Sequence, residues 1–233
     1  MLFRSSDIAL GTARLFGIDL LRNFAFPYFS RDIAEFWRRW HISLSTWFRD
    51  YLYIPLGGSK GGTWKKVKNT FIIFLVSGFW HGANWTFIVW GLLNAIYIMP
   101  SILFNTNRTN LDTVARGKYL PTVKELLSMA ITFCLTILAW IFFRAESISQ
   151  AADYISGIFS SSLFVLPEIH PVPISLLIIV FMIIEWIGRE QQYAIAKIGV
   201  KWQKPVRWAF YLLILEAIFL FAGKQQQFIY FEF

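Results

Sequence analysis

Thirty-one consecutive residues of this chain, 69–99, contain no Asp, Glu, Lys or Arg. A helix that crosses a bilayer needs only about 20 apolar residues, so this stretch is too long for one spanning helix and too short for two. Gly82 and Asn84 interrupt it near its middle. We therefore predict a short helix from Asn69 to Trp80, a break, and a full helix from Trp85 to about Leu103.

His81 lies at this break, directly before Gly82. An ionisable side chain inside an apolar membrane stretch is by default a candidate for a functional site. Irregular backbone at that depth survives only where protein buries it or where it lines a wet cavity. We therefore expect His81 to face a tunnel. The alternative is a packed histidine that is hydrogen-bonded to a backbone carbonyl of a neighbouring helix.

The composition is typical of a membrane protein, with 56% hydrophobic and only 15% charged residues. Soluble domains carry about 25% charged residues. The sequence therefore predicts an all-α, polytopic membrane protein with about five membrane helices, one of them interrupted or re-entrant near His81, plus interfacial amphipathic helices. Three further candidate spans are bounded by polar or basic residues: Leu126 to Phe143, Ile174 to Ile187 and Val206 to Ala222.

Positive charge is concentrated at the front of the chain. Residues 1–68 hold 11 Lys and Arg against 5 Asp and Glu, whereas residues 69–233 hold 11 against 9. The positive-inside rule places residues 1–68 on the cytoplasmic side, as a basic interfacial region of one membrane domain whose membrane helices fill 69–233. The run from Trp37 to Trp40 superficially resembles a nucleic-acid-binding pattern, but the flanking apolar spans argue against a nucleic-acid partner.

A helix is predicted from Ser30 or Asp32, either of which can cap it, to about Phe48. One face of this helix would be an apolar stripe, so the His41 side chain on it would point into the protein interior. The stripe consists of Trp37, His41, Leu44 and Phe48. Helicity is expected to end at Asp50 to Gly58, because Pro55 disfavours a helix before it.

The sequence supports neither a metal site nor a serine hydrolase site. His41 and His81 are 40 residues apart on separate elements, and Cys134 is isolated in a predicted span where we expect its thiol to pack, so no metal site is predicted. What remains is general-base chemistry. A neutral His81 imidazole can take the proton of a substrate hydroxyl that attacks an activated acyl group, which typically contributes about 10²–10⁴-fold in rate. His41 could orient the substrate, or could simply be a packed histidine.

Two sequence motifs carry a family resemblance. The first runs from Phe36-Trp37-Arg38-Arg39-Trp40-His41 to Pro55-Leu56-Gly57-Gly58, and the second is Phe79-Trp80-His81-Gly82. Together they resemble the membrane-bound O-acyltransferase family, and most of all its bacterial branch of alginate O-acetyltransferase, peptidoglycan O-acetyltransferase and teichoic-acid D-alanyl transferase membrane subunits. Residues 228–233 also resemble the C-terminus of that branch.

The resemblance implies a site. His81 matches the essential active-site histidine of the family and His41 its second, tunnel-lining histidine, so both are predicted catalytic residues. Arg49 and Asp50 fall in the first motif, as structural or substrate-positioning residues. The predicted substrate-binding residues are these two with Trp80 of the second motif and Asn84 just after it.

The resemblance also implies a reaction. Family members carry an acyl group from an activated cytoplasmic donor, through a tunnel, to an acceptor outside. We expect no bound cofactor, with an acyl-CoA or an acyl carrier thioester as co-substrate and acetyl as the acyl group. The expected acceptor is a hydroxyl of a cell-surface polysaccharide such as alginate, or an extracytoplasmic partner transferase. The expected location is the inner (cytoplasmic) membrane, with several spans in the lipid bilayer.

Family members are considerably longer than this chain, which is similar to the C-terminal half of such a protein. Two alternatives stay open at this point. A transporter or channel module also uses broken helices near the membrane centre, but it would be expected to place acidic groups opposite the break, and residues 69–99 contain none. An inactive fragment of an acyltransferase is the second alternative.

Overall fold

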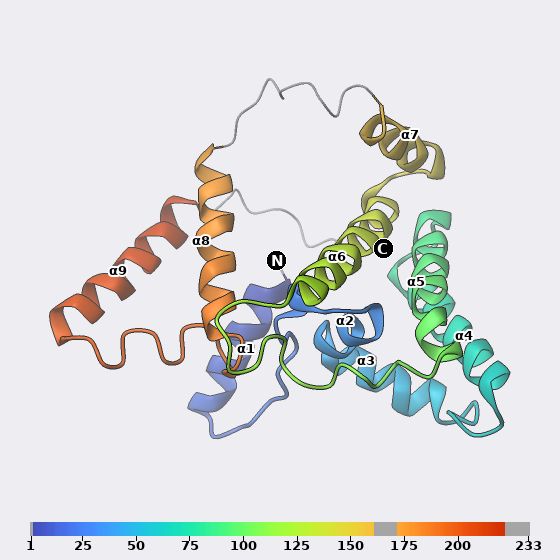
Figure 1. Ribbon diagram of the computed structural model, residues 1–233, viewed down its shortest axis with the longest axis horizontal. Coiled ribbons are helices and arrows are strands. Elements are labelled where there is room, and N and C mark those ends of the chain that lie inside the picture. The colour runs from blue at the N-terminus through green and yellow to red at the C-terminus, as the bar shows by residue number, and fades with distance from the viewer. Residues whose placement is uncertain (1, 161–171, 222–233) are drawn as a thin grey trace. The chain divides into compact units, whose positions relative to one another are not determined.

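A computed structural model of the protein describes residues 2–160 and 172–221, and every regular element in these ranges is a helix (Figure 1). The predicted all-α class is confirmed. The chain divides into two compact units, Met1–Leu177 and Ile178–Phe233, which are described separately below. That residues 1–233 belong to one membrane domain stays a prediction, and the C-terminal resemblance over 228–233 lies outside the described residues.

The front of the first unit is a series of short helices. In chain order these are α1 (Leu2–Leu15), η1 (Pro27–Phe29), α2 (Ile33–Arg39), α3 (Ile42–Phe48) and η2 (Arg49–Tyr53). Asp32 caps α2 as predicted, since its side chain accepts a hydrogen bond from the Glu35 backbone N–H. The single helix predicted from this point to Phe48 is wrong, because His41 adopts a left-handed backbone conformation that separates α2 from α3.

The predicted end of helicity at Asp50 is also wrong. η2 continues directly from α3 as a π-helix through Tyr53. Pro55 follows only after this extra turn, so it limits how far the helix extends without ending it at Asp50.

α4 (Thr63–His81) and α5 (Trp85–Leu103) form an antiparallel hairpin (Figure 1). The break and the bounds of α5 are as predicted. The predicted start of the first helix at Asn69 is wrong, because α4 begins six residues earlier and takes in Lys65 and its basic neighbours. At 19 residues each helix is about 28 Å long, close to the thickness of a bilayer core. α4 carries three lysines near its start, and of this pair only α5 is apolar enough to cross a membrane.

Two glycines allow the helices of this hairpin to approach closely. A Cβ at Gly78 of α4 would meet the Phe87 carbonyl of α5, and a Cβ at Gly91 of α5 would meet the Phe74 carbonyl of α4. Small residues at such crossings bring backbones into contact, as is common between membrane helices. The pairing of α4 with α5 therefore depends on both positions lacking a side chain.

The last two helices of the first unit before the undescribed residues 161–171 are α6 (Val123–Arg144) and α7 (Ile148–Ile158). α6 starts with a reciprocal cap, in which the Thr122 hydroxyl accepts from the Glu125 backbone N–H while the Glu125 carboxylate accepts from the Thr122 backbone N–H. Cys134 is exposed on α6, so the expectation that its thiol packs inside the protein is wrong.

An ion-pair network fastens the segment between α5 and α6 to α2. Glu35, which is 1% exposed, bonds Arg31 at 3.1 Å and Arg39 at 2.7 Å. Both arginines also donate to the Asp112 carbonyl at 2.9 Å. Trp37 then ties α2 to α5, because its indole N–H donates to the side-chain oxygen of Asn94 at 3.2 Å. Arg31, Arg39 and Trp37 thus hold α2 in place among the longer helices.

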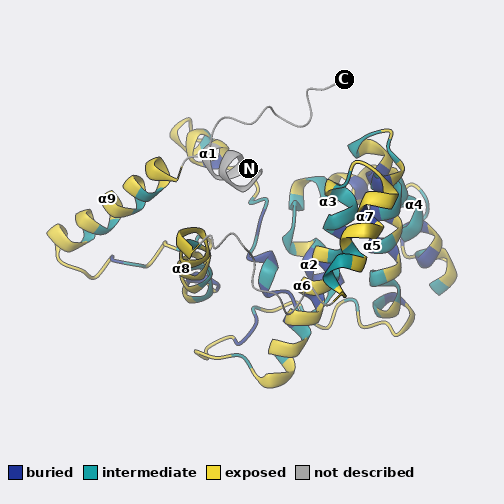
Figure 2. Ribbon diagram, turned by 90° about the horizontal axis from the view of Figure 1, so that it is seen from above, coloured by how far each residue is buried: buried dark blue, intermediate teal, exposed yellow. Residues whose placement is uncertain are grey.

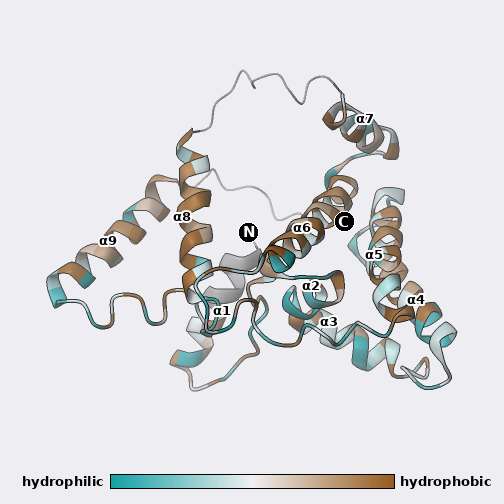
Figure 3. Cartoon of the chain, viewed as in Figure 1, coloured by the Kyte–Doolittle hydropathy of each residue, from teal (hydrophilic) through white to brown (hydrophobic). Residues whose placement is uncertain are grey.

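The second unit contains most of α8 (Val172–Gly188) and all of α9 (Lys204–Leu220). Their side chains are largely exposed (Figure 2), and α8, like α5 and α6, is strongly apolar (Figure 3). In the described ranges α5 and α6 are long and apolar enough to cross a membrane, while α8 is apolar but shorter. The number of about five membrane helices stays a prediction.

Candidate functional site

His81 is the last residue of α4, and the glycine after it makes the break. Gly82 has φ 152°, a conformation that side chains rarely adopt, and a Cβ there would lie 2.8 Å from the Phe87 ring. Aromatic rings surround the imidazole: the centroid of Trp80 is 5.0 Å from that of His81, Trp90 5.2 Å, Phe143 4.9 Å and Phe87 6.2 Å. The sequence break therefore places the end of α4 inside an aromatic cluster drawn from α4, α5 and α6.

His41 occupies the turn between α2 and α3 with φ 46° and ψ 55°. A non-glycine residue in this region costs about 1–3 kcal/mol and persists only where its surroundings enforce it. Its Nδ1 atom is buried and has no hydrogen-bond partner in the part of the chain that the structure describes. Burial lowers the pKa of the His41 imidazole, which favours the neutral ring. The predicted stripe through His41 does not exist, because α2 and α3 are separate helices.

The structure brings the two histidines to the same end of α6. Trp140 of α6 packs on Trp40 with ring centroids 5.1 Å apart, and Phe143, three residues on, packs on His81. Residues three apart share a helix face. His41 adjoins this cluster through Phe24, whose ring lies 5.9 Å from His41 and 5.0 Å from Trp40. The two predicted catalytic residues, from different elements, thus belong to one neighbourhood.

Trp80 and Asn84, the predicted substrate-binding residues near the break, have different surroundings. Trp80 is 52% exposed, and its ring contacts that of His81. Asn84 caps α5: its oxygen accepts from the Thr86 backbone N–H at 3.1 Å, and its amide donates to the Glu146 carbonyl at 3.0 Å. Asn84 thereby ties the break to the residues between α6 and α7, and substrate binding by either Trp80 or Asn84 stays a prediction.

Arg49 and Asp50 form an exposed ion pair on η2. Arg49 Nε donates to Asp50 Oδ1 at 2.7 Å, and this hydrogen bond holds the pKa of the Asp50 carboxyl below its usual range. The pair lies on a different element from either histidine. Its role in substrate binding therefore stays a prediction.

Sequence reasoning missed three residues that shape the site. Trp140 and Phe143 of α6 pack on Trp40 and His81, and Asn23 accepts hydrogen bonds from the start of α3. The two aromatics had a signal, since they stand three apart at the end of an apolar helix. Asn23 had none, because its partners are 20 residues away along the chain.

The model of the membrane-bound O-acyltransferase family matches residues 2–142. This chain belongs to the membrane-bound O-acyltransferase family. The family resemblance is therefore confirmed, and a membrane-bound family agrees with the two long apolar helices, α5 and α6.

Named relatives come from the bacterial branch. The chain is 34% identical to a probable alginate O-acetylase of Pseudomonas putida, with 98% of this chain and 49% of that protein covered. It is 32% identical to the peptidoglycan O-acetyltransferase of Helicobacter pylori, with 97% and 45% covered. It is 36% identical to the teichoic acid D-alanyltransferase of Streptococcus thermophilus, with 59% and 36% covered. The chain thus spans half or less of the length of these relatives.

Proposed function

We propose that this chain supplies the histidine centre of a membrane O-acyltransferase, which moves an acyl group from a thioester donor to a hydroxyl. The observation that carries the proposal is the position of His81, at the Gly82 break in an aromatic cluster that includes Phe143 of α6. His41 adjoins the same end of α6 through Phe24, Trp40 and Trp140. A titratable base in such surroundings is suited to proton transfer with little competing water.

The proposed step balances as a simple acyl transfer. The His81 imidazole takes the proton of the acceptor hydroxyl while its oxygen attacks the thioester carbonyl. A C–O bond forms, the C–S bond breaks, and the leaving thiolate takes the proton back from the imidazolium. General-base assistance of this kind supplies about 10²–10⁴-fold in rate. His41 and Trp80 would hold the acyl chain or acceptor against His81.

Acetyl is the acyl group that the relatives favour. Two relatives that align with nearly all of this chain bear the names of O-acetyl-transferring proteins, one for alginate and one for peptidoglycan. We therefore propose O-acetylation of a cell-surface polysaccharide, alginate among the candidates, or of an extracytoplasmic partner transferase. The donor would be acetyl-CoA or an acetylated carrier protein on the cytoplasmic side of a multi-pass protein in the cytoplasmic membrane.

The test replaces His81 with Gln or Ala in the intact gene of the organism that carries it. Mild alkali releases ester-linked acetate from the cell envelope, and this acetate is measured per amount of the chain in the membrane fraction. We expect a loss of about 100-fold or more with normal membrane abundance. His170→Ala, a change at the third histidine of the chain, is the matched control and should leave the acetate unchanged. Normal acetate from stable His81 variants would refute the general-base role.

A further inference from the structure

The segment 23–25 is hydrogen-bonded on both sides of His41. The Ala25 backbone N–H donates to the Arg39 carbonyl at 2.9 Å, and the Ile42 backbone N–H donates to the Asn23 carbonyl at 2.9 Å. The Arg39 guanidinium adds a third bond, to the Ala25 carbonyl at 3.2 Å. The turn that contains His41 is therefore fixed at the residues before and after it by one short segment.

The side chain of Asn23 provides the cap that α3 otherwise lacks. A helix usually begins with a residue whose own side chain accepts from a backbone N–H of the first turn. His41 occupies that position and makes no such bond. The Asn23 Oδ1 atom accepts instead from the Ser43 backbone N–H at 3.0 Å and from the Ser43 hydroxyl at 2.8 Å.

This arrangement leaves the imidazole available for another role. If His41 capped α3 itself, its ring would be committed to the backbone and its φ would be extended, as in an ordinary cap. With Asn23 as the cap, His41 takes the left-handed conformation, and its ring stands against Phe24 with a buried Nδ1 that bonds to nothing in the described residues. Strained residues of this kind need neighbours that enforce them.

We propose that Asn23 is a positioning residue that holds His41 in its left-handed conformation, so that the imidazole is oriented toward the substrate acyl group or acceptor. The inference rests on the proposed function, in which His41 takes part in acyl transfer. Asn23 acts only through His41 and does not touch the reacting atoms. Its effect on the reaction therefore depends on the presence of the His41 imidazole.

The first experiment compares variants in the intact gene, with ester-linked envelope acetate measured per amount of the chain in the membrane. Asn23→Ala removes the acceptor of both hydrogen bonds from Ser43 and should lower acetate about tenfold. Asn23→Asp keeps an acceptor at the same distance and should retain most of the activity. Ser43→Ala removes one donor but leaves the backbone N–H, so it should behave as the wild type. If Asn23→Ala fails to accumulate, Asn23→Gln replaces it, since the longer side chain moves the acceptor.

The second experiment is a double-mutant cycle with His41→Ala. If Asn23 acts through His41, Asn23→Ala should lower activity no further once the imidazole is gone. Additive losses would overturn the proposal, because Asn23 would then act independently of His41. Equal losses in Asn23→Ala and Asn23→Asp would overturn it as well. Full activity of His41→Ala would refute the part given to His41 in the proposed function itself. Wild-type activity of Asn23→Ala beside a reduced but measurable activity of His41→Ala would instead overturn only the role proposed for Asn23.

Discussion

At the scale of single residues, Glu35 is the centre of the charge network that secures α2. Its carboxylate is buried, which is tolerated because Arg31 and Arg39 bond both of its oxygens. Arg31 extends the network to Asp112 at 2.9 Å and to Glu125 at 3.7 Å. The network reaches the turn of His41 through Arg39, so buried charge at one end of α2 helps to fix the site at the other.

Asp112 gives this network a pH dependence. Its hydrogen bond from Arg31 holds the pKa of the Asp112 carboxyl below its usual range. A carboxyl with a depressed folded-state pKa adds stability above its unfolded pKa of about 4, and this stability is lost as the pH falls through the folded value. The side chain is 55% exposed, so the pair is worth only about 0.2–1 kcal/mol.

We therefore expect the detergent-solubilised protein to lose stability as the pH is lowered from 6 toward 3, with part of the loss absent in Asp112→Asn. Melting temperature against pH is the measurement, and Asp153→Asn, at an exposed position on α7, is the matched control. Identical pH profiles for the wild type and Asp112→Asn would show that Asp112 contributes nothing to this dependence.

At the scale of elements, the contact between α4 and α5 determines where His81 lies. Gly91 of α5 rests against the Phe74 carbonyl, one residue from Trp90, whose ring packs on His81. A methyl group at position 91 would have to push the two helices apart. Because α4 ends at His81, such a shift would move the imidazole relative to the aromatic rings of α5.

Gly91→Ala should therefore destabilise the protein by about 1–3 kcal/mol and lower acyl transfer in the same variant. Gly11→Ala is the matched control, since a Cβ at Gly11 meets nothing within 4 Å and alanine favours the helix. Thermal melts of the solubilised variants give the first quantity and envelope acetate the second. A Gly91→Ala protein as stable as Gly11→Ala would mean that the hairpin can adjust without cost.

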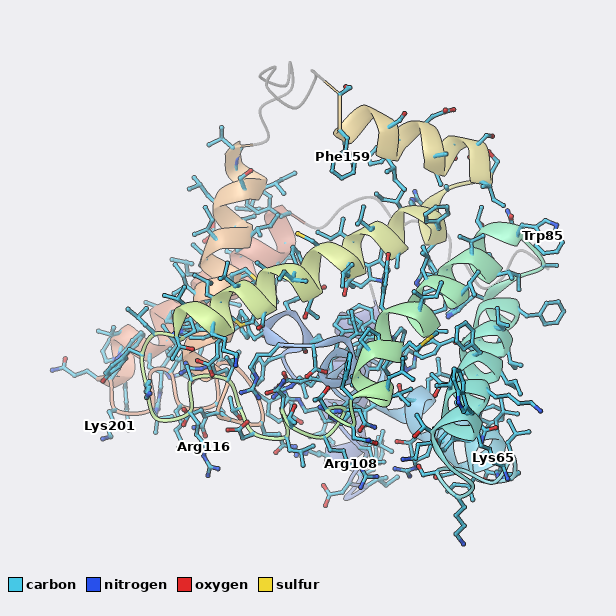
Figure 4. All side chains as sticks on the ribbon, turned by 45° about the vertical axis from the view of Figure 1, so that its right-hand side comes forward. Lys65, Trp85, Arg108, Arg116, Phe159 and Lys201 are labelled. Atoms are coloured by element: carbon cyan, nitrogen blue, oxygen red, sulfur yellow. The ribbon has the colours of Figure 1, made fainter. Side chains whose placement is uncertain are left out.

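At the scale of the whole molecule, the two ends of the α4–α5 hairpin differ in charge, and this difference predicts its orientation across the membrane. Lys65 lies at one end of the α4–α5 pair and Trp85 at the other (Figure 4). The basic turn before α4 contains Lys60, and residues 51–111 contain no Asp or Glu to offset its lysines. The positive-inside rule therefore predicts that the Lys65 end faces the cytoplasm.

Lys60→Cys in a Cys134→Ser background tests this orientation, because Lys60 is exposed and Cys134 is the one cysteine of the sequence. A membrane-impermeant thiol reagent should leave intact cells unlabelled and should label the chain after permeabilisation. The cysteine-free Cys134→Ser protein provides the background signal. Labelling in intact cells would reverse the predicted orientation.

The sequence by itself determined the features that depend on local chemistry. The break at Gly82 and the bounds of α5 follow from hydropathy and backbone freedom. Asp32 was one of two predicted caps for α2, and the structure selects it through the hydrogen bond that it accepts from the Glu35 backbone N–H. The motif around His41 and His81 was sufficient to indicate the family, which the match over residues 2–142 shows.

Only the tertiary structure decided how these pieces form a site. The left-handed turn at His41 opposes its local helical pattern and is enforced by Asn23, which is distant in sequence. α4 begins at Thr63, earlier than hydropathy indicates, because a helix end can carry lysines where a bilayer core cannot. Trp140 reaches Trp40 across 100 residues of chain. Contacts between distant segments outweigh local preference at these points, and local pattern alone does not reveal them.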